Sequence, residues 1–322
     1  MNIATFAGAA LAAIAFHSSA LAQAWPSRSL TFIVPFAAGG GTDAFARPLA
    51  AQLDTQLGQR IVIENKAGAG GTVGASAAAT ARPDGYNFFI GAAHHAIAPA
   101  IYPKLDYDIE KDLIAIGVIA EPPHVVVVHP TKVAARSLKE LIDFARANPG
   151  KMNYASAGNG TTHHLAGELF KILSKTNIAH VPYRGAGPAL QDLLAGHVDI
   201  AFDGLGSSAA QIAGGSLRAL AVAAPKRSPA FPDLPTAAEA GLPGYEVSTW
   251  YALFAPKGTP DEVIARMSAE LKKALDAPAI RDTWGKNGSP VPSLYGADFA
   301  KFVTSEVARW GKVVREAGVK AE

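Results

Sequence analysis

The stretch LTFIVPFAAGGGTD, residues 30–43, contains the features that decide the fold. It opens with an apolar, β-branched run at 30–34, which predicts a buried strand. Three glycines follow at 39–41 and allow backbone angles and close approaches that side chains forbid. Thr42 can then cap a helix that has Asp43 in its first turn. A strand, a small-residue loop and a helix in this order predict an α/β protein.

A second stretch, MNYASAGNGTTHH at 152–164, repeats this order, with a helix expected to begin near Thr162. The unpaired N–H groups and the dipole of a helix start favour an anion. Two such starts facing each other would hold a carboxylate without any arginine. An ordinary capped turn is the alternative at each loop, but three consecutive glycines exceed what a turn needs. The candidate ligand-binding residues of the two loops are Ala38, Gly39, Gly40, Gly41, Thr42, Asp43, Ser156, Ala157, Gly158, Asn159, Gly160 and Thr161.

Strand-like and helical patterns alternate along most of the remaining chain. Short apolar or β-branched runs predict further strands at 60–64, 87–90, 114–119, 125–128, 152–155, 179–182, 198–202, 219–223 and 247–255. This alternation implies parallel sheets with helices on both faces. One helical face repeats every four residues, at Phe45, Leu49, Leu53 and Leu57. Pro48 falls within it, and an interior proline costs about 3 kcal/mol, so a kink or a looser helix start is expected there.

Two proline-containing segments, 120–128 and 225–243, suit crossings of the chain between two lobes. On this basis residues 25–127 and 246–322 are assigned to a first lobe, and residues 128–245 to a second. A chain of this length can bury a large core, and two lobes are commoner than one at this size.

The apolar stretch 1–24 ends in Ala22-Gln23-Ala24, a pattern that signal peptidase accepts, so we expect an exported protein whose mature chain starts near Trp25. No later stretch reaches the ~20 apolar residues of a membrane helix. Cysteine is absent, which excludes thiol chemistry. The 29 Lys and Arg are interspersed with 27 Asp and Glu. This balance argues against a nucleic-acid or polybasic membrane surface.

Taken together, several motifs resemble the Bug (TctC-type) periplasmic solute-binding receptors of tripartite tricarboxylate transport systems. They span nearly all of the mature chain and include PFAAGGGTDAFAR (35–47), LGQRIVIENKAGAGG (57–71), YASAGNGTTHHLAGELF (154–170), HVPYRGAGPALQDLLAGHVDIAFD (180–203) and WYALFAPKGTP (250–260). The resemblance implies two lobes that close on a solute like a Venus flytrap, a periplasmic location, and permease subunits as partners. It also implies that the two glycine loops hold the carboxylate. Pro48 and the pair His94-His95 depart from the family pattern.

Other side chains near these loops are candidates for reading the rest of the solute. Phe36 could pack on an apolar or aromatic ligand or belong to the core. His94 and His95 follow a strand at its ligand-facing end, and His163 opens the second helix. Each histidine pair has an ordinary structural role as its main alternative, since adjacent histidines do not converge on a metal. Further candidates on strand ends are Tyr183, Arg184 and Asp203.

The motifs favour a monomeric binding protein without cofactor or metal over an enzyme. There is no GxSxG, HExxH or paired-carboxylate motif, although Ser156 with His163 or His164 could be drawn as a hydrolase pair. The sequence leaves the ligand open. Phe36 and the histidines favour a planar aromatic (di)carboxylate such as terephthalate, and the alternatives are aliphatic di- or tricarboxylates and acidic amino acids.

Overall fold

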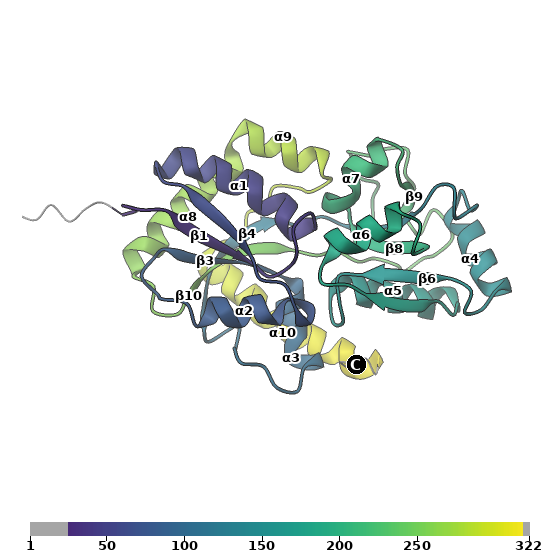
Figure 1. Cartoon of the computed structure of the whole chain (residues 1–322), viewed down its shortest axis with the longest axis horizontal. Coiled ribbons are helices and arrows are strands. Elements are labelled where there is room, and N and C mark those ends of the chain that lie inside the picture. Colours follow the sequence, from purple (N-terminus) through teal and green to yellow (C-terminus); the bar gives the residue numbers. More distant parts are fainter. Residues whose placement is uncertain (1–24, 318–322) are drawn as a thin grey trace, which may run out of the picture.

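The computed structural model describes residues 25–317, so the expected signal peptide at 1–24 lies outside the described part of the chain. The described residues form two lobes side by side, each built on one five-stranded sheet (Figure 1). No helix between residues 25 and 317 is long and apolar enough to cross a membrane. The predicted α/β class and two-lobed architecture are confirmed.

The first lobe, on the left of Figure 1, has a sheet in the order β2-β1-β3-β10-β4. Its strands are β1 (Leu30–Val34), β2 (Ile61–Asn65), β3 (Asn87–Ala92), β4 (Leu113–Ala120) and β10 (Tyr251–Pro256). One face of the sheet is covered by α1 (Gly41–Leu57), α8 (Asp261–Asp276) and α9 (Pro278–Lys286). The other face is covered by α2 (Thr72–Ala79), α3 (Ala93–Ile101) and α10 (Gly296–Ala317).

The second lobe has a sheet in the order β7-β6-β8-β5-β9. Its strands are β5 (His124–Val128), β6 (Asn153–Ser156), β7 (Ala179–Pro182), β8 (Ile200–Gly204) and β9 (Arg218–Val222). Helices α4 (Leu138–Ala147) and α5 (Thr162–Ser174) pack on one face. Helices α6 (Ala186–Leu194) and α7 (Leu205–Ala213) pack on the other.

Both sheets are mixed, whereas the sequence predicted parallel sheets. β1 pairs in parallel with β2 and β3, and β6 does so with β7 and β8. β10 runs antiparallel to β3 and β4, and β5 runs antiparallel to β8 and β9. The reason is the path of the chain between the lobes. β10 re-enters the first sheet at the end where β4 leaves it, with Tyr251 opposite Ala120, so the two strands must run in opposite directions.

The first crossing between the lobes is shorter than expected. All of β5, from His124 onward, pairs with the second sheet, so the crossing is limited to residues 121–123. The expected lobe boundary at 127/128 therefore falls inside a strand of the second lobe.

The return crossing lies later than the expected segment 225–243. That segment stays with the second lobe, where Leu242 is part of the core. The chain leaves this core after Val247 and joins the core of the first lobe at Trp250. The two crossings also bond to each other, since the N–H of Thr249 donates to the carbonyl of Pro122 at 3.2 Å.

Helix α1 follows the predicted apolar face closely. Phe45, Leu49 and Leu53 are fully buried against the first sheet, and burying each stabilises the fold by roughly 1.5–3 kcal/mol. Pro48 lies within this one helix, which still begins at Gly41 and runs on to Leu57. The helix start is therefore not displaced by the proline, whose side chain is partly exposed.

Candidate functional site

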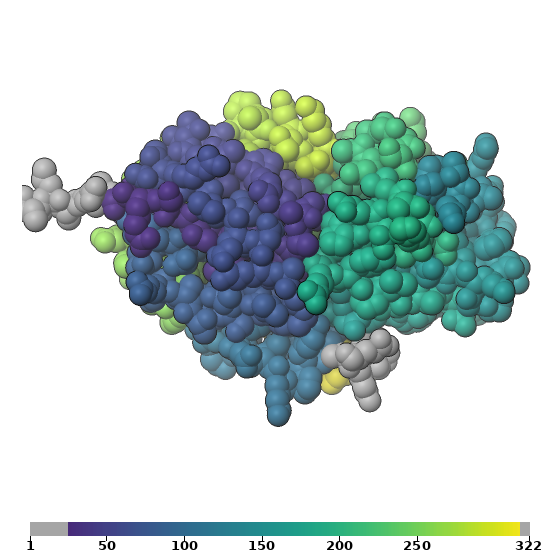
Figure 2. Space-filling view, in the orientation of Figure 1, coloured from purple at the N-terminus to yellow at the C-terminus, as the bar shows by residue number. Residues whose placement is uncertain are grey.

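The two lobes meet at a junction formed by small residues, and their surfaces join along a continuous boundary in the view of Figure 2. The loop after β1 contacts the start of α6 in the other lobe. The N–H of Ala37 donates to the carbonyl of Arg184 at 3.3 Å. A Cβ atom at Gly187 would overlap the carbonyl oxygen of Ala38. The lobes are therefore closed on each other, and residues of this junction are buried.

The start of α1 carries backbone donors without partners. Gly40 is the N-cap and offers no side chain, so the prediction that Thr42 caps this helix is wrong. The N–H groups of Gly41, Thr42 and Asp43 make no hydrogen bond to any residue from 25 to 317, and neither does the Thr42 hydroxyl. Thr42 is only 4% exposed. A buried helix start with free donors suits an anion.

Asp43 shapes the loop in front of α1. Its carboxylate accepts the N–H of Gly39 at 3.1 Å and the Nε–H of Arg47 at 2.8 Å. The Asn65 amide donates both to this carboxylate and to the carbonyl of Phe36. Gly39 adopts a φ of +83°, which favours glycine. Asp43 is thus engaged within the protein and holds the loop in place, which fits its position in the first turn.

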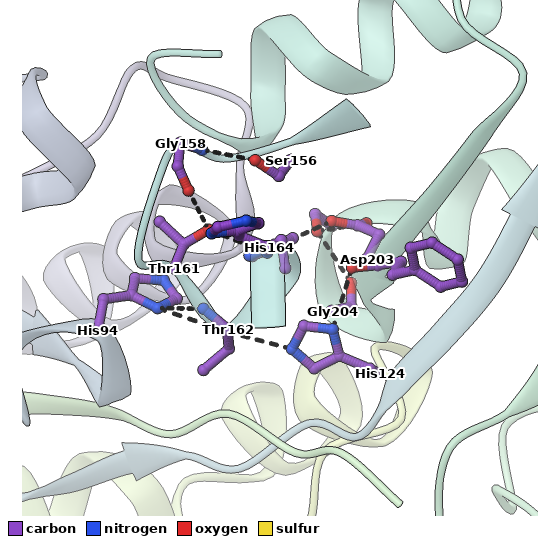
Figure 3. Close-up of polar contacts among 12 residues, drawn as sticks. His94, His124, Ser156, Gly158, Thr161, Thr162, His164, Asp203 and Gly204 are labelled. Carbon is purple, nitrogen blue, oxygen red and sulfur yellow. Dashed lines mark hydrogen bonds and ion pairs between the residues drawn. The ribbon is translucent and has the colours of Figure 1, made fainter. Parts of the chain in front are cut away.

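The start of α5 differs because the N–H groups of Thr162 and His164, two of its first three, already have partners (Figure 3). Thr161 is the N-cap and its hydroxyl accepts the N–H of His164. The N–H of Thr162 donates to Nδ1 of His94, which comes from the first lobe, at 3.1 Å. Gly160 donates its N–H to Nδ1 of His164 at 3.2 Å. The helix begins at Thr162 as predicted, but the loop amides are not free for a solute to the extent expected.

Ser156 is paired with a histidine that the sequence did not single out. Its Oγ lies 2.6 Å from Nε2 of His180 and also accepts the N–H of Gly158 at 3.1 Å. The hydrolase pair drawn from the sequence, Ser156 with His163 or His164, is therefore wrong. Ser156 is 1% exposed, and burial lowers the pKa of His180 to about 4. This pair fixes the loop containing the buried Ala157.

Three histidines pack together at the junction as neutral rings. Burial holds the pKa of His94 and of His124 well below the usual range. Burial also lowers the pKa of His95 to about 4. His95 accepts the N–H of Ala92 at 2.9 Å, a bond within its own helix start. His94 and His95 thus have structural partners, and His94 joins the two lobes.

His163 and Asp203 form a buried pair in the second lobe. Nε2 of His163 lies 3.1 Å from Oδ1 of Asp203, and the Ser207 hydroxyl donates to the other carboxylate oxygen at 2.7 Å. Nδ1 of His163 is buried without a hydrogen-bond partner among the described residues. His124, which the sequence did not suggest, packs its ring 5.0 Å from His163.

The remaining candidates lie at different depths. Phe36 is 4% exposed and packs edge-on against His94, with ring centres 5.1 Å apart. The Tyr183 hydroxyl donates to Asp192 at 2.6 Å. Arg184 is exposed and lines an open pocket of about 570 Å³ between the lobes, together with Asn159. Phe36 is therefore part of the buried packing at the junction, while Arg184 lies in the open pocket at its surface.

Several residues of the junction were missed because no local pattern marks them. Tyr251 is 1% exposed, and its hydroxyl lies so close to Gly41 that a side chain there would collide with it. Thr249 is equally buried, with its hydroxyl unpartnered within the described chain. Thr249 lies in the return crossing and Tyr251 follows it, and only the three-dimensional path of the chain brings them to the junction. Residues 25–317 contain no group of three or more acidic or histidine side chains arranged to hold a metal.

Comparison with known proteins gives one consistent family. The model described as tripartite tricarboxylate transporter family receptor matches residues 45–319. The structure of the periplasmic binding protein BugD is 34% identical, with a TM-score of 0.89, covering 92% of this chain and 100% of that one. Rpa4515 of R. palustris with adipate is 37% identical, with a TM-score of 0.88 and coverage of 92% and 100%. MatC of Rhodopseudomonas palustris with bound malate is 37% identical, with a TM-score of 0.84 and coverage of 90% and 100%.

Proposed function

Because the chain belongs to the family of tripartite tricarboxylate transporter receptors, we propose that it captures a small organic carboxylate between its lobes and delivers it to the permease of such a transporter. The family consists of periplasmic solute-binding proteins, as the likeness to BugD illustrates. The free N–H groups of Gly41, Thr42 and Asp43, at a buried helix start between the lobes, are the observation that carries the proposal.

In this proposal the carboxylate accepts from the start of α1. Hydrogen bonds to a charged group contribute roughly 1.5–3 kcal/mol each. The three N–H groups and the Thr42 hydroxyl together reach the ~8 kcal/mol of a micromolar complex before the losses of association. The contacts between the loop after β1 and the start of α6 exist only when the lobes meet. Closure around the bound solute then excludes water and completes the site.

Aliphatic dicarboxylates are the first solutes to test. The similar proteins with adipate and malate carry aliphatic acids. An aromatic dicarboxylate such as terephthalate is the second class, but Phe36 lends it less support than the sequence suggested, since its ring packs on His94. Arg184, exposed in the open pocket between the lobes, is our candidate for contact with a second carboxylate of the solute.

The proposal is tested by thermal unfolding of the full mature chain with succinate, adipate, malate, citrate and terephthalate. A binder gains RT ln(1 + [L]/Kd), or about 2.7 kcal/mol at a hundredfold excess over Kd, and returns the ligand unchanged. The absence of any shift with all five acids would contradict the receptor proposal. Conversion of an acid into a product would instead show an enzyme.

A further inference from the structure

The pair of His163 and Asp203 has no role in holding a carboxylate at α1. His163 is the second residue of α5, and Asp203 lies at the end of β8. Their side chains are 5% and 2% exposed, respectively, and lie 3.1 Å apart. A buried carboxylate such as that of Asp203 needs hydrogen-bond partners, because burying an ionised group costs free energy unless the group is fully paired.

Asp203 fixes which nitrogen of His163 carries the proton. An ionised carboxylate only accepts hydrogen bonds, and Ser207 already donates to its second oxygen. The bond to Oδ1 therefore uses the Nε2–H of His163. In the neutral ring this leaves a lone pair on Nδ1, which can only accept a hydrogen bond.

Nothing in the described chain donates to this lone pair. Nδ1 of His163 has no partner from residue 25 to 317, and the residue is 4% exposed. The two neighbouring rings are engaged elsewhere, His94 with the N–H of Thr162 and His124 with the carbonyl of Phe202. A buried acceptor without a donor costs roughly 1–3 kcal/mol, so such atoms have a water or a ligand as partner.

The pair is also close to the start of α1. The Tyr251 hydroxyl adjoins Gly41, and a Cβ at Gly204 would contact the same hydroxyl at 3.5 Å. Gly204 follows Asp203 directly in β8. Thr249, whose hydroxyl is also unpartnered within residues 25–317, lies beside Gly204. Gly204 and Tyr251 thus form a continuous set of neighbours between the pair and the start of α1.

We propose that His163 selects a hydroxylated carboxylate, whose hydroxyl group donates to Nδ1 while the carboxylate binds the start of α1. This inference rests on the proposed function and names its substrate class. A carboxylate oxygen cannot donate to Nδ1, whereas a hydroxyl group can. An ammonium group could also donate, but α1, α5 and α7 all begin around this junction and their positive ends disfavour a cation. Hydroxy acids therefore fit better than amino acids.

The test measures affinities by calorimetry for pairs of acids that differ by one group: malate against succinate, 2-hydroxyglutarate against glutarate, and citrate against tricarballylate. Leaving a buried polar group unpaired is a strong basis of selection. We expect at least one hydroxy acid to bind tenfold or more tightly than its partner. Aspartate, compared with succinate, tests the ammonium group and should bind no more tightly. Equal affinities within every pair, or a preference for aspartate over malate, would overturn the inference.

Two variants separate selection from a merely structural role. Asp203→Asn keeps the shape, but its amide can donate to Nε2 and so moves the ring proton to Nδ1. The malate-to-succinate preference should then fall to near one, with succinate binding retained. Persistence of the preference would overturn the inference. If this variant does not fold, the ¹⁵N spectrum of the His163 ring in the wild-type protein provides the test. Nδ1 should be unprotonated, and its ¹⁵N chemical shift should change with malate but not with succinate. Failure of all acids to bind would instead reject the proposed function itself.

Discussion

Helices α1 and α5 begin at the same junction from opposite lobes, yet the donors at their starts have different partners. At α1 the N–H groups of Gly41, Thr42 and Asp43 have none among residues 25–317. At α5 the N–H of Thr162 is taken by His94 across the junction, and that of His164 by Thr161. The three N–H groups at the start of α1 are therefore free within the described chain, while the start of α5 is bonded in part across the junction. We infer that the two loops serve different steps, with solute binding at the start of α1 and contact between the lobes at the start of α5.

Acid should act on the buried neutral histidines of the junction. The native pKa of His95 is about 4, against an ordinary value of 6.5, and those of His94 and His124 are also lowered. The unfolded chain takes up protons below 6.5 while the native chain does not, so stability is complete above pH 6.5 and falls toward pH 4. For His95 alone the difference corresponds to about 3 kcal/mol.

Chemical denaturation between pH 7.5 and 4.5 measures this loss. His95→Gln is the matched variant, since an amide can replace both ring contacts without titrating, and it should show a shallower decline. Equal stability of the wild-type protein at pH 7.5 and 5 would contradict the assignment of neutral rings.

Filling the small-residue contact between the lobes should weaken closure. In Gly187→Ala the new methyl group meets the backbone of Ala38, and overpacking of this kind costs about 1–3 kcal/mol. The cost falls only on the closed form, so we expect roughly 5- to 150-fold weaker binding with little change in the stability of the free protein. Gly285→Ala in α9, which has open space around it, is the control and should bind normally. Full affinity in Gly187→Ala would mean that the lobes do not meet here when the solute is bound.

Removing the Thr42 hydroxyl tests whether the start of α1 binds the carboxylate. Thr42→Val keeps the shape and deletes one donor to a charged group, a loss of about 1.5 kcal/mol or more, so carboxylates should bind at least tenfold more weakly. Thr55→Val changes an exposed threonine of the same helix and should leave calorimetric affinities unchanged. If Thr42→Val binds carboxylates as tightly as the Thr55→Val control, the carboxylate does not bind at the start of α1.

The contact across the junction should matter least. His94→Phe keeps a ring of similar size but removes the acceptor of the Thr162 N–H, a neutral hydrogen bond worth about 1 kcal/mol. Affinity should fall about fivefold for every solute alike, because the loss concerns closure rather than recognition. A loss confined to one class of acid in the calorimetric panel would show instead that His94 touches the solute.

Local patterns predicted most of the elements. β1 and β7 have the expected bounds, and the apolar face of α1 packs as the periodicity indicated. Strand direction was not predictable in the same way, because β10 is placed by the return crossing rather than by its own residues. The crossing itself was expected in the proline-rich segment, yet Leu242 and Val247 belong to the core of the second lobe.

The candidate site shows the same limit. The two loops were identified from glycines and capping residues, which act locally. The partners of their polar atoms come from far along the chain, as when His94 meets Thr162 and His180 meets Ser156. Only these distant partners decide which donors remain free, so the sequence predicted that both helix starts hold the carboxylate, whereas the N–H groups of Thr162 and His164 are bonded within the protein.

A crystal structure of the protein with succinate tests this division most directly. We expect a carboxylate whose oxygens lie about 3 Å from the N–H groups of Gly41 and Thr42, with His94 still bonded to Thr162. A carboxylate bound instead to the N–H of Thr162, with His94 displaced, would contradict it.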